Sequence, residues 1–380
     1  MRTAKGSAPS PTKGRAERVA VVFRKRRIDD GNFEAASAFD VNNDGQIDIV
    51  CGGYWYQGPD FTQKHKICEV EWEGEYRKDF SSIPMDVNGD GYIDIITGSW
   101  WGEGLYWREN PGPSGGEWKT HLIGRCTNIE TIRVFDIDGD GVPEIFPNTP
   151  GSPQAFFKLV TDENGRGAGA FTRHVIGEAP SGHGMGFGDV NGDGKADIIL
   201  AGGWLEQPEN LFLDRWIFHP EFNLGPASVP ILCYDVNGDG VNDLIVGIGH
   251  GYGLYWYEQI IQPNGRRAWV AHEIETKSSQ YHDLQLADID NDGKLELITG
   301  SRYRAHNGND PGEHNPIGTF YFKGVDGGAF ERVVIDYGDP ATASGLGIYF
   351  WLADLTGSGR LDIVAPGKEG LYVFYNEGEG

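Results

Sequence analysis

Seven acidic segments recur along the chain, and their side chains are suited to binding a divalent cation. The segments begin at aspartates 46 to 66 residues apart, namely Asp40, Asp86, Asp136, Asp189, Asp235, Asp288 and Asp354. In the first six, carboxylate or carboxamide residues fall at positions 1, 3, 5 and 9, and glycine stands at position 6. Oxygen ligands at alternating positions, with glycine at a sharp turn, are typical of Ca²⁺ loops.

We expect about six structural calcium ions, one in each of the first six loops. The predicted ligands are Asp40, Asn42, Asp44, Asp48, Asp86, Asn88, Asp90, Asp94, Asp136, Asp138, Asp140, Glu144, Asp189, Asn191, Asp193, Asp197, Asp235, Asn237, Asp239, Asp243, Asp288, Asp290, Asp292 and Glu296. In the seventh loop Thr356 and Ser358 replace the ligands at positions 3 and 5, so we expect that loop to be empty or weak.

A second set of residues stands about six or seven positions ahead of each loop. The set is Glu34, Asp79, Glu130, His183, Ser228, His282 and Gly347. Singly, each ionisable member is most often a hydrogen-bonded group at the end of a strand. Gathered around one point, they would form an acid–base site or a divalent-metal site. We predict that His183 and His282 act as base or metal ligand, and that Glu130 joins them if an additional divalent metal is held there.

The carboxylates of this set allow another enzyme chemistry. Glu34, Asp79 and Glu130 could supply the acid and the base of a hydrolase, which works with two carboxyl groups at a fixed separation. The sequence does not give that separation, so this alternative stays open.

Aromatic and basic residues follow the apolar run after each loop, and one such segment, 301–318, is unusually long. Within it, we predict that Arg302 stabilises developing negative charge and that Tyr303 is a weaker candidate for the acid. Indole faces stack on sugar rings, and guanidinium groups pair with carboxylates. The predicted partner is therefore an oligo- or polysaccharide. The predicted substrate-binding residues are Trp100, Trp101, Trp204, His250, Arg304 and Lys368.

The elements that must position these residues are short strands, four to a repeat. An alternating stretch such as "ETIRVFD" precedes each loop, an apolar run such as "DIITG" follows it, and two further strands come after turns rich in Gly and Asn. The last repeat stops after its third strand, and the segment 18–28 resembles the missing fourth. We predict an all-β fold, a seven-bladed β-propeller over 17–380 in one domain, closed by its N-terminal strand. The segment 1–16 is predicted to be a disordered tail.

The acidic loops resemble those of the FG-GAP/VCBS repeat family, and the resemblance covers essentially the whole chain after the tail. It implies a propeller with Ca²⁺ in the turn between the first two strands of a blade. The sixth repeat, with its long insertion, is similar to the propeller of fungal aldos-2-ulose dehydratases. Seven-bladed propellers also occur among polysaccharide lyases that act on glucuronate-containing glycans. Both resemblances imply β-elimination on a uronate-containing glycan or a keto-sugar, with one site at the mouth of the central channel.

A binding module is the competing interpretation. Propellers of this family also resemble integrin heads and some fungal lectins, which bind without catalysis, so a calcium-stabilised carbohydrate-binding propeller is the alternative. A lectin would repeat equivalent residues in each blade, whereas here the residues ahead of the loops differ and the long insertion occurs once. This asymmetry favours a single central site and hence an enzyme.

Composition excludes several other classes. The formal net charge of −24 argues against nucleic-acid binding, which needs a basic surface. No run of 18 apolar residues indicates a membrane span. The four cysteines lack the spacing of a zinc site, and we expect free thiols, with a Cys51–Cys68 bridge as the alternative. Calcium sites favour an extracytoplasmic location, although the first residues do not form a signal peptide. The oligomeric state stays undetermined.

Overall fold

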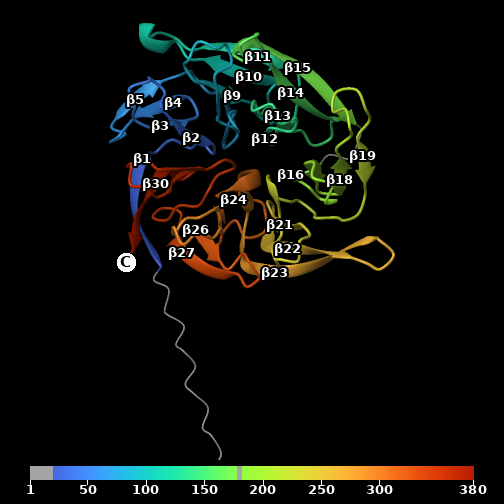
Figure 1. The fold of residues 1–380 in the computed structure, drawn as a ribbon. Helices are drawn as coiled ribbons and strands as arrows, with labels where there is room; N and C mark the ends of the chain where they lie inside the picture. The colour runs from blue at the N-terminus through green and yellow to red at the C-terminus, as the bar shows by residue number, and fades with distance from the viewer. Residues whose placement is uncertain (1–19, 178–181) are drawn as a thin grey trace, which may run out of the picture.

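A computed structural model describes residues 20–177 and 182–380, and the predicted tail over 1–16 lies outside these described residues. The fold is all-β, as the sequence predicts, with sheets that follow one another around a ring (Figure 1). The helical elements of the described residues are two short 3₁₀ turns, η1 (Gly112–Ser114) and η2 (Ala305–Asn307). None of the helices in the described part of the chain has the length and apolar character needed to cross a membrane.

Five sheets have four strands each. In the order of the ring their strands are β2 (Ala36–Phe39), β3 (Asp48–Cys51), β4 (Tyr54–Gln57) and β5 (Gln63–Lys66); β8 (Ile83–Met85), β9 (Asp94–Thr97), β10 (Leu105–Glu109) and β11 (Lys119–Gly124); β12 (Thr131–Phe135), β13 (Glu144–Asn148), β14 (Gln154–Thr161) and β15 (Gly167–Gly177); β24 (Tyr281–Ala287), β25 (Glu296–Ser301), β26 (Ile317–Lys323) and β27 (Glu331–Gly338); and β28 (Trp351–Ala353), β29 (Asp362–Gly367), β30 (Gly370–Glu379) and β1 (Val21–Asp29).

A sixth sheet has eight strands, made of two four-stranded antiparallel halves. The halves are β16 (Met185–Gly188), β17 (Asp197–Leu200), β18 (Gly203–Glu206) and β19 (Ile217–His219), and β20 (Ile231–Tyr234), β21 (Asp243–Gly247), β22 (Tyr252–Ile261) and β23 (Arg267–Ser279). They join where β16 runs parallel to β20, at Gly186 opposite Ile231. A Cβ on Gly186 would lie 1.9 Å from the Ile231 carbonyl oxygen, so only glycine allows this approach. A small hairpin, β6 (Trp72–Glu73) and β7 (Tyr76–Arg77), lies between the first two sheets in the chain.

The second strand of every four-stranded unit is buried along its whole length, as in β3, β9 and β21. Both faces of such a strand pack against neighbouring sheets, which explains why it reads as a continuous apolar run rather than an alternating one. The ring closes where β1 pairs antiparallel with β30, from Val21 opposite Glu379 to Asp29 opposite Leu371. The N-terminal strand therefore completes the sheet that contains the C-terminal strand, as the sequence predicts.

A buried ion pair occupies the axis of the ring. Arg133 of β12 donates to Asp283 of β24 at 2.8 Å, and the same nitrogen also donates to the carbonyls of Val229 and Ile348. The guanidinium lies over the ring of Tyr349, 4.3 Å from its centroid. These partners come from sheets that are not all neighbours, so one side chain ties several sheets together across the middle.

Side-chain amides join consecutive sheets. Four residues, two directly after the third strand and two within it, donate to the backbone carbonyl at position 2 of the acidic loop in the preceding repeat. The four contacts are Asn110 to Val41 (2.9 Å), Gln207 to Ile137 (3.2 Å), Gln259 to Val190 (3.0 Å) and Asn376 to Ile289 (2.8 Å). Because these donors recur at one position, they stabilise the stacking of sheet on sheet around the ring.

Gln259→Leu should lower the free energy of unfolding by about 1 to 3 kcal/mol, because the buried carbonyls of Val190 and Asn242 would lose their donor. Urea denaturation followed by tryptophan fluorescence measures the change. Gln262→Leu, at an exposed turn position, is the control and should shift the free energy of unfolding by less than about 0.5 kcal/mol. Equal effects of the two substitutions would show that the amide contact contributes nothing.

Candidate functional site

Each acidic loop is closed by its first and ninth residues. In the first loop, the Asp40 carboxylate accepts hydrogen bonds from the backbone nitrogens of Asp44 (3.1 Å) and Gly45 (2.7 Å). Asp48 accepts from Val41 (2.9 Å) and from Gly58 (2.7 Å), which follows β4. Positions 1 and 9 therefore shape the loop and fasten it to the third strand.

The seventh loop keeps this closure although it lacks ligands at positions 3 and 5. Asp354 accepts from Ser358 (2.9 Å) and Gly359 (2.7 Å), and Asp362 accepts from Leu355 (3.0 Å). Shape and ligation are thus separable: positions 1 and 9 fold the loop, and positions 3 and 5 distinguish the six loops predicted to bind a cation.

The predicted ligands of those six loops are carboxylate and amide oxygens, the donors that Ca²⁺ prefers. Asp40 Oδ1 and Asn42 Oδ1 both accept from the Asp44 backbone nitrogen, at 3.1 and 3.0 Å, so oxygens from positions 1 and 3 lie close together in the loop. Position 6 has a φ of +87° in Gly45, which requires glycine. Burial raises the pKa of the ninth-position carboxyl to about 7 in Asp94 and in Glu296. A cation would offset the cost of ionising these buried groups.

Three of the residues predicted ahead of the loops meet near the middle of the ring, where β12, β16 and β24 lie in Figure 1. Glu130 directly precedes β12, His183 stands two residues before β16, and His282 is in β24. His250 comes from the turn between β21 and β22, and Arg302 directly follows β25. We call these five residues the central cluster.

One oxygen of Glu130 is the meeting point of the central cluster. Glu130 Oε1 lies 3.7 Å from His183 Nδ1, and 3.9 Å from His250 Nε2, His282 Nδ1 and Arg302 Nη1. Four basic side chains thus surround a single carboxylate oxygen, two of them beside the eight-stranded sheet and two from the sheet of β24 to β27. The sequence predicted Glu130, His183, His282 and Arg302 for one site, and the structure brings them together.

Arg302 is held in place by a second predicted residue, Glu34. The guanidinium donates to Glu34 from two nitrogens, at 2.7 and 3.3 Å, and both side chains are buried. A third nitrogen donates to His282 Nε2 at 3.1 Å, so the proton of the neutral His282 ring lies on Nδ1. Burial, together with the charge of Arg302, holds the pKa of His282 well below 6.5.

His250 has the opposite proton arrangement. Its Nδ1 donates to Asp310 Oδ2 at 2.7 Å, which leaves a lone pair on Nε2. Burial, with the nearby charges of His183 and Arg302, lowers the pKa of His250 to about 3. Nε2 is buried and has no hydrogen-bond partner, and only 9% of the side chain is exposed. This nitrogen is free to bind a proton, a substrate hydrogen or a metal ion.

The donors around Glu130 fit a transition-metal ion. Zinc binds nitrogen and oxygen at about 2.0 to 2.2 Å, so two ligands of one tetrahedral ion lie roughly 3.5 Å apart. Glu130, His250 and His282 each offer one ligand atom, and these three atoms lie within 4.8 Å of one another. The distance of 3.9 Å from Glu130 Oε1 to His250 Nε2, and also to His282 Nδ1, is close to that value and too long for a hydrogen bond. His183, predicted as a ligand, lies 3.7 Å from the same oxygen but does not belong to that group. Asp310 accepts from the other nitrogen of His250, as a carboxylate usually does for a metal-binding histidine. His282 would have to bind through Nδ1, because its Nε2 accepts from Arg302.

The long segment between β25 and β26 crosses the central cluster, and we call residues 303–316 the strap. The His306 ring stacks on His250 with centroids 4.1 Å apart, and its Nδ1 lies 2.8 Å from Asp310. Arg304 pairs with Glu75 at 2.5 Å, and Asn307 accepts from the Glu75 nitrogen at 3.4 Å. The strap therefore reaches from the sixth repeat to the β6–β7 hairpin and covers the cluster.

The strap is under backbone strain. Arg304, His306 and Asn307 have φ values of +53°, +46° and +57°, a left-handed conformation that costs energy outside glycine. Glu313, also in the strap, is buried with both oxygens unpartnered, and burial raises its pKa to about 7. Backbone strain and unpartnered polar atoms are common in functional sites, because these sites are shaped for binding and not for stability.

Two predicted residues are engaged elsewhere. Asp79 pairs with Arg108 at 2.8 Å and accepts from Thr97 at 2.9 Å, in a buried ion pair of the second sheet. Trp204 is fully buried in β18, where it stacks on His219 with centroids 4.2 Å apart. This burial contradicts the prediction that Trp204 contacts carbohydrate, because the preceding turn is so short that the tryptophan already belongs to the strand.

The remaining predicted residues border the central cluster. Trp100 lies parallel to His183, with centroids 6.2 Å apart, and Trp101 packs on Tyr76 while 37% of it stays exposed. Lys368 lies over the Tyr76 ring and donates to the Arg304 carbonyl. Tyr303 is a half-buried residue of the strap.

Sequence reasoning missed the role of Asp310 and placed His250 in substrate binding rather than in the cluster. The unusual length of the insertion was the signal for Asp310. The four cysteines are free thiols, so the alternative Cys51–Cys68 bridge is not formed.

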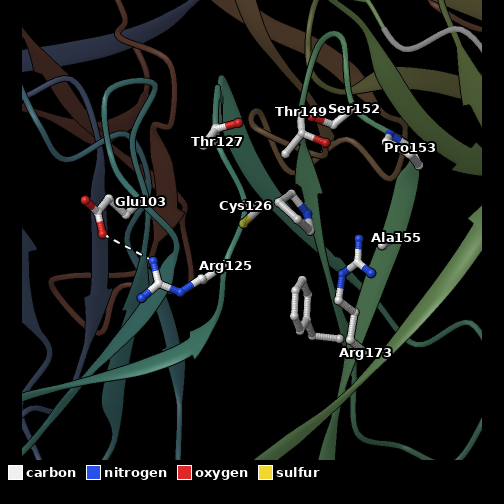
Figure 2. Close-up of a pocket in the computed structure, with 11 residues that line it drawn as sticks. Glu103, Arg125, Cys126, Thr127, Thr149, Ser152, Pro153, Ala155 and Arg173 are labelled. Atoms are coloured by element: carbon white, nitrogen blue, oxygen red, sulfur yellow. Dashed lines mark hydrogen bonds and ion pairs between the residues drawn. The ribbon is translucent and has the colours of Figure 1, made fainter.

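Figure 2 shows a pocket of about 400 Å³ that lies away from this cluster. It opens between the sheets of β10 and β14, and Glu103 pairs with Arg125 at 3.3 Å on its rim. It contains no residue that the sequence predicted for a site, and its lining offers no comparable set of titratable groups.

Two segments of the chain, residues 86–146 and 235–299, match the FG-GAP-like repeat family. The chain thus carries FG-GAP-like repeats, as the sequence predicts. A T-cell immunomodulatory protein homolog of Plasmodium falciparum (isolate 3D7) is 26% identical over 140 residues, 32% of this chain and 19% of that protein. Its counterpart in Plasmodium yoelii yoelii is 26% identical over 141 residues, 32% of this chain and 20% of that protein. The chain spans about a fifth of the length of these relatives.

Solved structures support the propeller-like fold. A chain in the crystal structure of BBS1N in complex with ARL6DN, soaked with lead, superposes with a TM-score of 0.53 at 12% identity, covering 94% of this chain and 98% of that chain. The same complex soaked with mercury gives a TM-score of 0.52 at 12% identity, with 94% and 97% covered. At this identity the similarity concerns the fold alone.

Acid should destabilise the protein through His282. Because its pKa in the fold lies well below 6.5, the unfolded chain binds a proton here at pH 5 and the folded chain does not. The free energy of unfolding therefore falls as the pH drops below about 6.5, and this contribution is complete above that value. In His282→Gln, unfolding should take up about one proton fewer near pH 5, measured as the slope of the unfolding free energy against pH. The exposed His314→Gln is the control, and equal slopes in both variants would contradict the assignment.

Proposed function

We propose that the ring is a seven-bladed β-propeller, that its first six acidic loops form calcium sites, and that its central cluster is the single active centre of a carbohydrate-active lyase. The blade count is supported by five four-stranded sheets and one eight-stranded sheet with two four-stranded halves. The calcium sites are supported by the convergence of oxygens at positions 1 and 3 and by the buried carboxyl at position 9. Calcium in such loops is a structural ion that suits an extracytoplasmic setting.

The observation that carries the lyase proposal is the meeting of three imidazoles and one guanidinium on one oxygen of Glu130. Low pKa values keep His250 and His282 unprotonated at neutral pH, so the cluster holds neutral bases beside a permanent positive charge. A base next to a fixed cation is what abstraction of a proton alpha to a carboxylate requires, because the cation stabilises the enolate-like charge that develops.

The accessibility of the side chains determines which residue takes which role in the elimination. His183 is the most exposed imidazole at Glu130, with 23% of its side chain accessible, and it takes the alpha proton. The electrons of that C–H bond form the new C=C bond as the bond to the beta oxygen breaks. The leaving oxygen takes a proton from His306, whose protonated ring would pair with Asp310 at 2.8 Å. Arg302 supplies the positive charge that stabilises the enolate-like intermediate. Glu34 is a positioning residue, because it is buried and holds the Arg302 guanidinium.

A divalent metal at Glu130, His250 and His282 would supply Lewis-acid stabilisation of the same negative charge. In that case Asp310 orients His250, and the strap excludes water from the site. A carbohydrate must then enter beside Trp100 and Trp101, where the Arg304–Glu75 contact of the strap is partly exposed. Opening of the strap is the step that admits substrate.

The proposal predicts that His183→Ala lowers kcat/KM by about 100-fold or more on a uronate-containing oligosaccharide or a keto-sugar. Product formation is followed by the absorbance of the unsaturated sugar across a panel of such substrates. His174→Ala removes a half-buried histidine of β15, outside both the central cluster and the strap, and should leave the rate unchanged. Elemental analysis after dialysis shows whether a transition metal accompanies calcium, and loss of that metal in His250→Ala would assign it to the cluster.

Glycan binding without an eliminated product, unchanged in both histidine variants, would overturn the lyase proposal and favour a lectin-like propeller. Cleavage that yields saturated sugars would instead favour hydrolysis by carboxylates.

A further inference from the structure

The pairing of strands defines one equivalent position in six repeats, at the third strand beside each acidic loop. The residue directly after position 9 pairs with a third-strand residue, as Leu244 does with Tyr257 and Ile145 does with Phe157. The equivalent position is the next residue of the third strand, which is Glu258 after Tyr257 and Lys158 after Phe157. Its occupants are Gln57, Glu109, Lys158, Glu206, Glu258 and Lys323.

The two repeats that have lysine at this position also differ in the loop itself. Position 3 is aspartate in both, Asp138 and Asp290, whereas the other four loops have asparagine. Position 9 is glutamate in both, Glu144 and Glu296, whereas the other four have aspartate. Three changes therefore occur together, in the same two loops.

Lys158 shows why these changes belong together. Its Nζ lies 2.7 Å from Asp138 Oδ2, 2.7 Å from Asp140 Oδ2 and 2.7 Å from Glu144 Oε1. An ammonium has three hydrogens, so each finds one carboxylate. These oxygens come from positions 3, 5 and 9, the same ligands that a calcium ion would use. The longer glutamate turns one oxygen to the lysine, where an aspartate such as Asp94 accepts a backbone N–H instead.

The sixth loop has one of these three contacts, the one to position 3. Lys323 Nζ lies 2.6 Å from Asp290 Oδ2, and both side chains are largely buried, with 11% and 5% exposed. In three of the other repeats the equivalent residue carries a negative charge and accepts from a histidine on the fourth strand. These contacts are Glu109 with His121 (2.8 Å), Glu206 with His219 (2.7 Å) and Glu258 with His272 (2.8 Å). In the first repeat the residue is the neutral Gln57. No cationic side chain occupies this position in those four.

We propose that the third and sixth loops carry their own cation, the ammonium of Lys158 or Lys323, and that calcium binds only in the first, second, fourth and fifth loops. The proposal rests on the calcium sites proposed above and reduces the number of loops that bind calcium from six to four. Asp138 and Asp290 add the negative charge that balances the ammonium. Two loops of the ring are then permanently closed, and four respond to the calcium concentration.

Native mass spectrometry of the whole chain in calcium-containing buffer, checked by elemental analysis, tests this inference. The wild type should retain about four calcium ions, and Lys158→Met with Lys323→Met should raise the number to about six, because each freed loop regains its ligands. Lys294→Met removes an exposed lysine from the sixth loop itself and should leave the number at about four.

The outcomes separate this inference from the calcium proposal. Six ions in the wild type would overturn the role of the lysines and leave the calcium sites intact. No calcium in the wild type or in the double variant would overturn both. If the double variant fails to fold, the wild-type number still decides, and Lys158→Met alone should add one ion.

Discussion

The buried guanidinium of Arg133 at the axis of the ring is the constraint on which the rest depends. Sheets in such a ring pack only on their neighbours, so nothing in that stacking fixes the distance across the middle. Arg133 supplies this distance, because a buried charge must have its partners in reach. Asp283 is its partner and also accepts from the Phe350 nitrogen at 3.0 Å. The residue before Asp283 is His282, so the same strand that anchors the axis presents an imidazole to the central cluster.

The first strand of a four-stranded unit separates two groups of polar residues, those of the acidic loop after it and those near its start, where Glu130, His183 and His282 of the central cluster lie. At the end of this strand, the acidic loops repeat the same backbone closure, so their chemistry is the same in each repeat. At its start, six or seven residues earlier, the repeats differ, and their side chains meet at one place. A repetitive scaffold thereby produces a site with no repetition in it, in which Glu130 is surrounded by groups from other sheets. The strap adds further asymmetry, since it comes from one repeat and binds the hairpin of another.

Local spacing was sufficient to predict the loops, the strands around them and the closure by the N-terminal strand. Position 6 needs glycine and positions 1 and 9 need carboxylates, and these requirements are visible in the chain. Spacing also brought Glu130, His183 and His282 to one site, because equivalent strand starts meet at the middle of the ring, and the unusual length of the insertion pointed to Arg302. It failed for Asp79, whose partner Arg108 lies on another strand, and for Trp204, whose stacking on His219 depends on strand register. Asp310 could not be placed, because its position follows from the left-handed turns of the strap. The position of Lys158 and Lys323 beside the third and sixth loops could be recognised only from the strand register.

The way the ring is closed also determines how it would respond to a pulling force. Because β1 and β30 are antiparallel, Val21 lies opposite Glu379, and the start of β1 and the end of β30 lie at the same end of the strand pair. Tension applied between these two points loads the hydrogen bonds of the pair one after another, as in a zipper, rather than all at once. The pairing of β1 with β30 should therefore break at a lower force than a pairing whose hydrogen bonds are all loaded together. A load borne by both ends would first strip the strand that closes the circle, while a load borne by one end alone would leave the ring intact.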